Sequence, residues 1–217
     1  MGMTNRRNRA IYRLWAPLYD STIERFFAPA RRRAMEVAAP RAGERVLLVG
    51  VGTGTDLTLL PAGVTAVGTD LSPAMLARAR RKLPLVDRKV TLLEADAQSP
   101  LSGHGTFDVV ILNLILSVVP DGAACLRASL SALAPGGRAV IFDKFVPDSA
   151  DAPTLGRRLL NAVTTRLGTD VTRRFGDLAR GTGCRVLLDE PSLLGGMYRI
   201  LLVAHDAPAP SASGPSR

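Results

Sequence analysis

The chain has 217 residues, of which 47% are hydrophobic, and it carries a net charge of +9. This length suits one globular domain. No apolar run reaches the roughly 18 residues that a membrane-spanning helix needs, and the basic N-terminus lacks the apolar segment of an export signal. Two cysteines, Cys125 and Cys184, are too few for a disulfide framework or a zinc site. We therefore expect a cytoplasmic protein without a bound metal.

The first 41 residues concentrate the positive charge. Residues 1–41 contain nine arginines against three acids, so they contribute +6 of the net +9. Apolar residues recur there at helical spacing, and a second helical piece opens with the sequence of a capping box. The apolar positions are Ile11, Leu14, Trp15 and Leu18, and the capping-box positions are Ser21 and Glu24. We expect residues 1–41 to form a basic helical lid on the domain that follows.

From residue 42 onward, apolar strands alternate with helices. The predicted strands are 45–50, 64–69, 90–94, 107–112, 137–143, 184–189 and 197–204. The predicted helices are about 55–60, 73–82, 121–133 and 154–181, the last broken near Gly168. Continuous apolar strands between helices are typical of a parallel sheet covered on both faces. The pattern predicts an α/β domain over 42–205 and a disordered, proline-rich tail over 206–217.

The first strand runs into three alternate glycines in VLLVGVGTGTDL, residues 46–57. Gly50, Gly52 and Gly54 would let the backbone turn sharply and approach a ligand at a helix N-terminus. The dinucleotide pattern G-x-G-x-x-G would need glycine where the chain has Thr55, and the Gly-Lys-Ser/Thr of a P-loop is absent. A tight turn without a ligand would also explain the glycines, so the loop alone indicates nucleotide binding only weakly.

Polar side chains follow the next strands at the edge where open α/β folds bind ligands. Asp70 ends the second strand, and a carboxylate there can accept hydrogen bonds from both hydroxyls of an adenosine ribose. Asp96 and Ala97 follow the third strand, where the carboxylate can accept from an adenine amino group. Asn113 follows the fourth strand. Helix capping by Asp70 and an ordinary loop role for Asp96 are the alternatives.

Together, VGVGTG, GTDLSPAML, EADA, FDVVILN and LAPGG resemble the class I S-adenosyl-L-methionine-dependent methyltransferases over about residues 45–145. The resemblance implies a Rossmann-like sheet of seven strands, mostly parallel with an antiparallel last strand and helices on both faces. It implies S-adenosylmethionine as the cofactor, with its methionine moiety on the glycine loop, its ribose on Asp70 and its adenine between Asp96, Ala97 and Met75. The implied cofactor-binding residues are Tyr19, Gly50, Gly52, Thr53, Gly54, Asp70, Leu71, Met75, Asp96, Ala97 and Asn113.

One position departs from the family pattern. The family commonly has Glu or Asp two residues before the first glycine, where this chain has Leu48. The departure affects the part of the site that holds the amino-acid end of the cofactor, where we expect Asp56 and backbone groups to compensate. A cofactor-binding regulator without activity is the reading that Leu48 leaves open.

The segment YRLWAPLYD at 12–20, with ARRRAMEVA and VGVGTG after it, resembles bacterial phosphatidylethanolamine N-methyltransferases and their quinone-methylating relatives. This resemblance implies that Tyr19 closes over the cofactor. A lipid ammonium must lose a proton before methylation, and a tyrosine or a carboxylate can accept it. Tyr19 and Asp143 are therefore the candidate catalytic residues. Core packing of Tyr19, and an ion pair of Asp143 with Lys144, are the alternatives.

We expect the chain to N-methylate phosphatidylethanolamine while docked on the anionic inner face of the membrane. A methyltransferase for a quinone or another small molecule would have the same core. The isoelectric point near 10.7 also suits a nucleic-acid-binding protein. Aromatic residues make up only 5% of the chain, however, and no stacking motif interleaves with the arginines, so we expect no nucleic-acid partner. The sequence indicates no oligomeric state.

Overall fold

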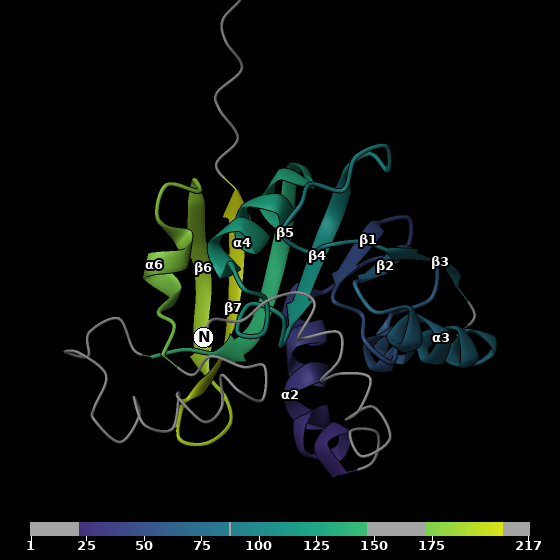
Figure 1. Ribbon diagram of the computed structural model, residues 1–217, viewed down its shortest axis with the longest axis horizontal. Coiled ribbons are helices and arrows are strands. Elements are labelled where there is room, and N and C mark those ends of the chain that lie inside the picture. The colour runs from purple at the N-terminus through teal and green to yellow at the C-terminus, as the bar shows by residue number, and fades with distance from the viewer. Residues whose placement is uncertain (1–21, 87, 147–171, 206–217) are drawn as a thin grey trace, which may run out of the picture.

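The computed structural model describes residues 22–86, 88–146 and 172–205, which form one seven-stranded sheet and its covering helices (Figure 1). The strands are β1 (Arg45–Val49), β2 (Thr65–Asp70), β3 (Lys89–Glu94), β4 (Phe107–Asn113), β5 (Leu133–Lys144), β6 (Cys184–Pro191) and β7 (Tyr198–His205). Their order in the sheet is β3-β2-β1-β4-β5-β7-β6. Strand β7 runs antiparallel to β5 and β6, and the other pairs are parallel. The predicted mostly parallel sheet with an antiparallel last strand is confirmed.

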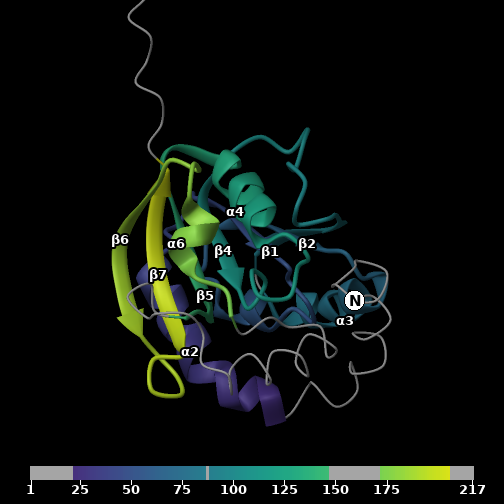
Figure 2. The ribbon, with the colours of Figure 1, turned by 60° about the vertical axis from the view of Figure 1, so that its left-hand side comes forward.

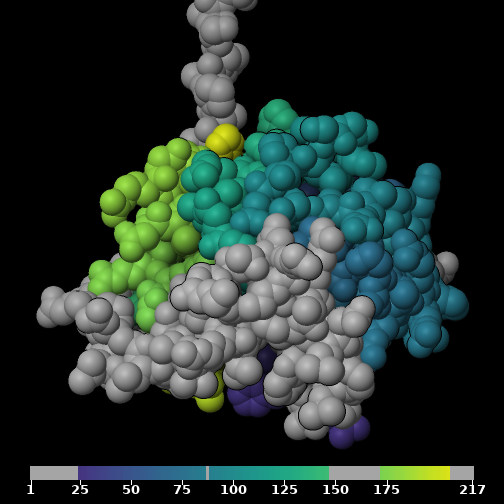
Figure 3. All heavy atoms as spheres, in the orientation of Figure 1, coloured from purple at the N-terminus to yellow at the C-terminus, as the bar shows by residue number. Residues whose placement is uncertain are grey.

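The helices lie in two layers, one on each face of the sheet. They are α2 (Thr22–Ala38), α3 (Pro73–Lys82), α4 (Gly122–Ser131) and α6 (Phe175–Ala179), with 3-10 turns η1 (Thr55–Leu59) and η2 (Leu83–Leu85). Successive strand residues point to opposite faces: Leu48 packs in the cluster that holds α2 and α3, and Leu47 packs in the cluster that holds α4 and α6. Figure 2 shows α4 and α6 side by side, and in Figure 3 their atoms form one continuous surface. None of the helices in the described ranges is long and apolar enough to cross a bilayer.

Two predicted elements differ from the observed ones because of long-range pairing. Strand β5 was predicted at 137–143, but it begins at Leu133 and includes Pro135-Gly136-Gly137. Phe107 pairs with Leu133, and the register of β4 and β5 shifts after that pair. Of the helix predicted at 154–181, residues 147–171 lie outside the described part. Residues 172–174 are not helical, because the backbone there bonds to the chain beyond β5, with Val146 N donating to Arg173 O at 2.9 Å.

Helix α2 packs in the same core as the sheet, although residues 1–41 were predicted to form a separate lid. Phe27, Ala30, Ala34 and Ala38 recur at helical spacing and are buried in the cluster that holds β1, β4 and β5. The Phe27 ring lies 5.9 Å from the Phe142 ring and 5.2 Å from the Tyr198 ring, measured between centroids. The described half of this segment is therefore part of the domain's core. The apolar stripe before it, Ser21, Tyr19 and the tail at 206–217 lie outside the described residues.

Replacing Phe27 with alanine should lower the free energy of unfolding by about 3–5 kcal/mol, because it leaves a cavity among packed rings. Phe26→Ala on the same helix is the matched control, since the Phe26 side chain is exposed and its loss should cost less than about 1 kcal/mol. Urea unfolding followed by circular dichroism measures both. An equal decrease of the free energy of unfolding in the two variants would contradict the packing of α2 in the core.

Candidate active site

A cavity opens at the carboxyl edge of the sheet, where the glycine loop and the ends of β2, β3 and β4 meet helix α2. Its lining residues are Glu24, Arg31, Gly50, Val51, Gly52, Thr53, Thr55, Asp70, Leu71, Ser72, Met75, Ala95, Asp96, Ala97, Asn113, Leu114, Ile115, Val118 and Val119. Every predicted cofactor-binding residue is among them except Gly54, which lies outside the lining, and Tyr19, which lies outside the described residues. The structure thus brings together side chains from four separate strand ends, as the parallel sheet predicts.

Two glycines of the loop have different reasons to lack a side chain. Gly52 has a φ of +57°, and a Cβ there would have no atom nearer than Gly50 O at 3.9 Å, so this position faces open space in the cavity. Gly54 has a φ of +82°, and its Cβ would lie 3.0 Å from Ala79 Cα on α3. Gly52 therefore keeps room for a ligand, whereas Gly54 allows the loop to pack on α3.

Asp70 joins the glycine loop to the end of β2. Its Oδ2 accepts a hydrogen bond from Gly52 N at 2.9 Å, and its Oδ1 accepts one from Ser72 N at 2.8 Å. Burial raises the pKa of Asp70, and these two backbone donors oppose the rise. The capping oxygen of α3 belongs to Ser72, which accepts from Met75 N at 3.4 Å, so helix capping does not account for Asp70.

The remaining predicted residues line the wall on either side of Asp70. Asp96 Oδ1 accepts from Gln98 N at 3.0 Å and from Gln98 Nε2 at 2.9 Å, and Met75 is buried in the first turn of α3. Asn113, at the end of β4, donates from Nδ2 to Asp56 Oδ2 at 3.1 Å. The Asn113 Oδ1 is buried at the cavity and has no hydrogen-bond partner among the described residues, which leaves an acceptor for a ligand.

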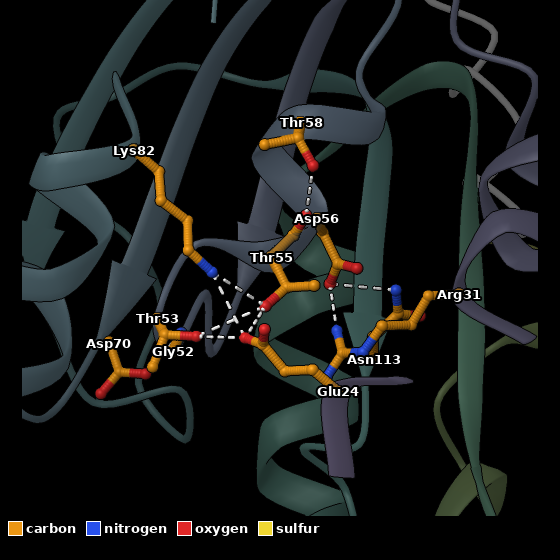
Figure 4. A network of polar contacts seen from close by, with 10 residues as sticks. All are labelled: Glu24, Arg31, Gly52, Thr53, Thr55, Asp56, Thr58, Asp70, Lys82 and Asn113. Carbon is orange, nitrogen blue, oxygen red and sulfur yellow. Dashed lines mark hydrogen bonds and ion pairs between the residues drawn. The ribbon is translucent and has the colours of Figure 1, made fainter. Parts of the chain in front are cut away.

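Helix α2 adds two charged residues that the sequence analysis did not assign to the site. Glu24 accepts hydrogen bonds from Thr53 Oγ1, Thr55 Oγ1 and Lys82 Nζ, and Arg31 donates to Asp56 Oδ2 at 2.6 Å (Figure 4). Both lie at helical spacing from buried Phe27 and Ala34, as charges on the apolar face of the helix. That placement is the sequence signal that could have identified them. Glu24 was instead expected to serve a capping box with Ser21, a residue outside the described part.

The residues expected to compensate for Leu48 take other roles. Leu48 is 2% exposed and packs in the core. Asp56 does not line the cavity; its Oδ2 accepts hydrogen bonds from Arg31 and Asn113, which do line it. The compensation expected from Asp56 is therefore wrong. Among the acids at the cavity, Glu24 is the one bonded to the glycine loop's threonines.

Asp143 does not face the cavity, contrary to its predicted catalytic role. It is completely buried and accepts from Ser117 N at 2.9 Å and from Lys144 N at 2.8 Å. Through Ser117, Asp143 fixes the segment after β4 that lines the cavity. Within the described ranges, no group of three or more His, Cys, Asp or Glu side chains could hold a metal ion.

The comparisons with known proteins identify the class that this fold and cavity define. The family described as "Methyltransferase domain" matches residues 47–141. A phosphatidylethanolamine N-methyltransferase of Cereibacter sphaeroides is 30% identical over 192 residues, 88% of this chain and 93% of that protein. A demethylmenaquinone methyltransferase of Thermus thermophilus is 35% identical over 150 residues, 67% of this chain and 68% of that protein. The chain belongs to the S-adenosylmethionine-dependent methyltransferases.

Solved structures agree on the fold. The cyclase SpnF has a TM-score of 0.78 at 16% identity and covers 94% of this chain, which in turn covers 97% of SpnF. The DhpI–SAH complex has a TM-score of 0.65 at 24% identity, and the match covers 93% of this chain and 96% of the DhpI chain. Because SpnF is named for a cyclisation, the fold alone does not define the reaction.

The cofactor is S-adenosylmethionine, and the cavity has features that fit it. The open space at Gly52 accommodates a ligand against the loop backbone, and the Asp70 carboxylate lines the same cavity. The Asn113 Oδ1, which has no hydrogen-bond partner in the described part of the chain, offers an acceptor at the end of β4.

Replacing Gly52 with valine should abolish binding of S-adenosylhomocysteine, the demethylated product, because the side chain would occupy the open space of the cavity. Gly103→Val is the matched control: Gly103 has a similar positive φ of +78° and no atom within 4 Å of its Cβ position, so it imposes comparable backbone strain without blocking the cavity. Isothermal titration calorimetry measures binding. A folded Gly52→Val variant that still binds normally would place the ligand elsewhere.

Replacing Asp70 with alanine should weaken S-adenosylhomocysteine binding about tenfold or more, because a hydrogen bond to a charged acceptor contributes roughly 1.5–3 kcal/mol. Asp177→Ala, at an exposed position of α6, is the control. This variant should bind S-adenosylhomocysteine as tightly as the wild type does. The same calorimetric titration checks both. A dissociation constant unchanged by Asp70→Ala would rule out its contact with the ribose.

Proposed function

We propose that the chain transfers a methyl group to the amine headgroup of phosphatidylethanolamine while its basic N-terminal segment, residues 1–41, is docked on the anionic inner face of the membrane. The observation that carries this proposal is the outer face of helix α2. Phe26 is 46% exposed there and has the exposed residues Arg25, Pro29 and Arg32 around it at helical spacing. An exposed aromatic ring among cations is what an interfacial helix presents to a bilayer.

The cations of this face differ in their partners. Arg33 is paired, since its Nε lies 2.8 Å from Glu190 Oε1 and its NH1 lies 3.3 Å from Glu36 Oε2. Arg25 and Arg32 form no ion pair with any residue of the described ranges. Each unpaired cation near an anionic surface contributes roughly 1 kcal/mol to binding. Their charge is therefore available to an anionic partner, and salt should weaken the attraction.

The sequence relatives support the same acceptor. The Cereibacter protein is named for phosphatidylethanolamine, and its similarity extends over 88% of this chain, against 67% for the Thermus protein named for demethylmenaquinone. The larger share includes more of the chain outside the common methyltransferase core at 47–141. We take the longer match as support for the phospholipid acceptor.

The reaction needs positioning more than chemical activation by the protein. When bound, S-adenosylmethionine supplies a methyl group on a sulfonium, and the deprotonated amine nitrogen forms a bond to that carbon as the carbon–sulfur bond breaks. The protein would hold the adenosine with Asp70 and Asp96 and would exclude water with the apolar segment after β4, Leu114 to Val119. Tyr19 remains the proposed acceptor for the proton that the ammonium loses beforehand.

A quinone is the second candidate acceptor. Three of the relatives are named demethylmenaquinone methyltransferases, with 32–39% identity. The apolar wall of Leu114, Ile115, Val118 and Val119 suits a quinone ring as well as a lipid. The two acceptors can be offered in the same vesicles, so one experiment separates them.

The test is methyl transfer from labelled cofactor to phosphatidylglycerol vesicles that contain either phosphatidylethanolamine or demethylmenaquinone, together with sedimentation of the protein on the same vesicles. We expect label in phosphatidylethanolamine, and pelleting that is lost at high salt. Changing Arg25 and Arg32 together to alanine should lower the partition coefficient of the protein onto the vesicles about 30-fold, which corresponds to roughly 2 kcal/mol of binding free energy.

The matched control changes Arg127 and Arg180 to alanine. Arg127 is exposed on α4 and Arg180 directly after α6, on the opposite face of the sheet, and their loss changes the net charge by the same amount. This double variant should partition onto the vesicles as the wild type does. Label in the quinone alone, or no pelleting at low salt together with methylation of a soluble amine, would rule out the phospholipid proposal.

A further inference from the structure

The family's acid before the glycine loop is missing from this chain, and another acid, Glu24, contacts that loop. At the family position, Leu48 is buried in the core and cannot reach a ligand. Glu24 comes instead from helix α2, lines the cavity, and bonds to Thr53 and Thr55 of the loop. An acid is thus present at the loop, but it is supplied by another element of the fold.

The Glu24 carboxylate is fixed through one of its two oxygens (Figure 4). Its Oε1 accepts from Thr53 Oγ1 at 2.9 Å, from Lys82 Nζ at 3.3 Å, and from Thr55 Oγ1. No donor from the described residues contacts its Oε2. The side chain is 23% exposed, at the cavity. A carboxylate that is held through one oxygen and lines a cavity is suited to bind a cationic ligand group.

The surroundings of Glu24 keep it ionised. Burial alone would raise the pKa of Glu24, but the hydrogen bonds from Thr55 and Thr53 and the nearby Lys82 ammonium together outweigh it, so the pKa lies below its ordinary value. The group therefore carries a full negative charge at neutral pH, where a ligand ammonium is positive.

Helix α2 presents a positive charge to the same cavity two turns further on. Arg31 follows Glu24 by seven residues, so both lie on one face of the helix, and both line the cavity. Arg31 is oriented by its contact with Asp56 Oδ2 at 2.6 Å. One helix face thus offers both signs of charge, which matches the ammonium and the carboxylate of an amino acid.

We propose that Glu24 binds the α-ammonium group of the cofactor's methionine moiety, in place of the acid that the family carries at position 48. The inference rests on the S-adenosylmethionine cofactor and is independent of the identity of the acceptor. It makes helix α2 part of the cofactor site. Any change that displaces α2 should therefore weaken cofactor binding as well as acceptor binding.

The test compares two ligands by calorimetry: S-adenosylhomocysteine, and its analogue with thiobutyrate in place of homocysteine, which lacks only the α-amino group. Glu24→Gln should weaken binding of S-adenosylhomocysteine about tenfold or more, because it removes the charge that pairs with the ammonium. It should change binding of the deaminated analogue by less than about twofold. This difference between ligands isolates the contact with the amino group.

Glu36→Gln is the matched control, since Glu36 lies on the outer side of the same helix with a side chain 66% exposed; it should leave both ligands unaffected. Thermal unfolding verifies that each variant is folded. Equal weakening of both ligands would mean that Glu24 only shapes the loop, and unchanged binding of S-adenosylhomocysteine would mean that it makes no contact; either result overturns the proposal. Failure of the wild type to bind S-adenosylhomocysteine would overturn the cofactor assignment itself.

Discussion

The ion pair between Arg31 and Asp56 joins the elements on which the cavity depends. Arg31 comes from α2 and Asp56 from the turn that follows the glycine loop, and their side chains are only 15% and 7% exposed. Asn113 from the end of β4 donates to the same carboxylate oxygen. Loss of one partner would leave a buried charge uncompensated, which is strongly destabilising. This contact therefore holds α2 against the sheet at the place where the cavity needs a wall.

Fixing α2 in this way gives its two faces different tasks. The inner face places Phe27 in the core and directs Glu24 and Arg31 to the cavity, while the outer face exposes Phe26 together with Arg25 and Arg32, which form no ion pair within the described ranges. In our proposals the inner face binds the amino-acid end of the cofactor and the outer face meets the membrane. A helix only 17 residues long would then bring the cofactor and a lipid headgroup to the same edge of the sheet.

The sequence predicts the parts of the site that depend on strand order alone. Parallel strands end at one edge, so Gly52, Asp70, Asp96 and Asn113 had to meet there once the strands were recognised. Side-chain direction at a strand end is harder to predict, because a shift of one residue reverses the face. Asp143 was expected at the ligand edge for this reason, whereas it is buried beneath the cavity wall.

Helical spacing from Phe27 and Ala34 places Glu24 and Arg31 on the apolar face of α2, but the sequence does not show that this helix covers the open side of the cavity. Its charged residues were attributed to a basic lid at the membrane surface. The central claim is that Glu24 replaces the missing acid of the β1 end, and a crystal structure with S-adenosylhomocysteine tests it most directly. We expect the ligand's α-nitrogen to lie within hydrogen-bond distance, about 2.7–3.2 Å, of the Glu24 carboxylate. An α-nitrogen bound only by other groups, with both Glu24 carboxylate oxygens beyond hydrogen-bond distance, would contradict it.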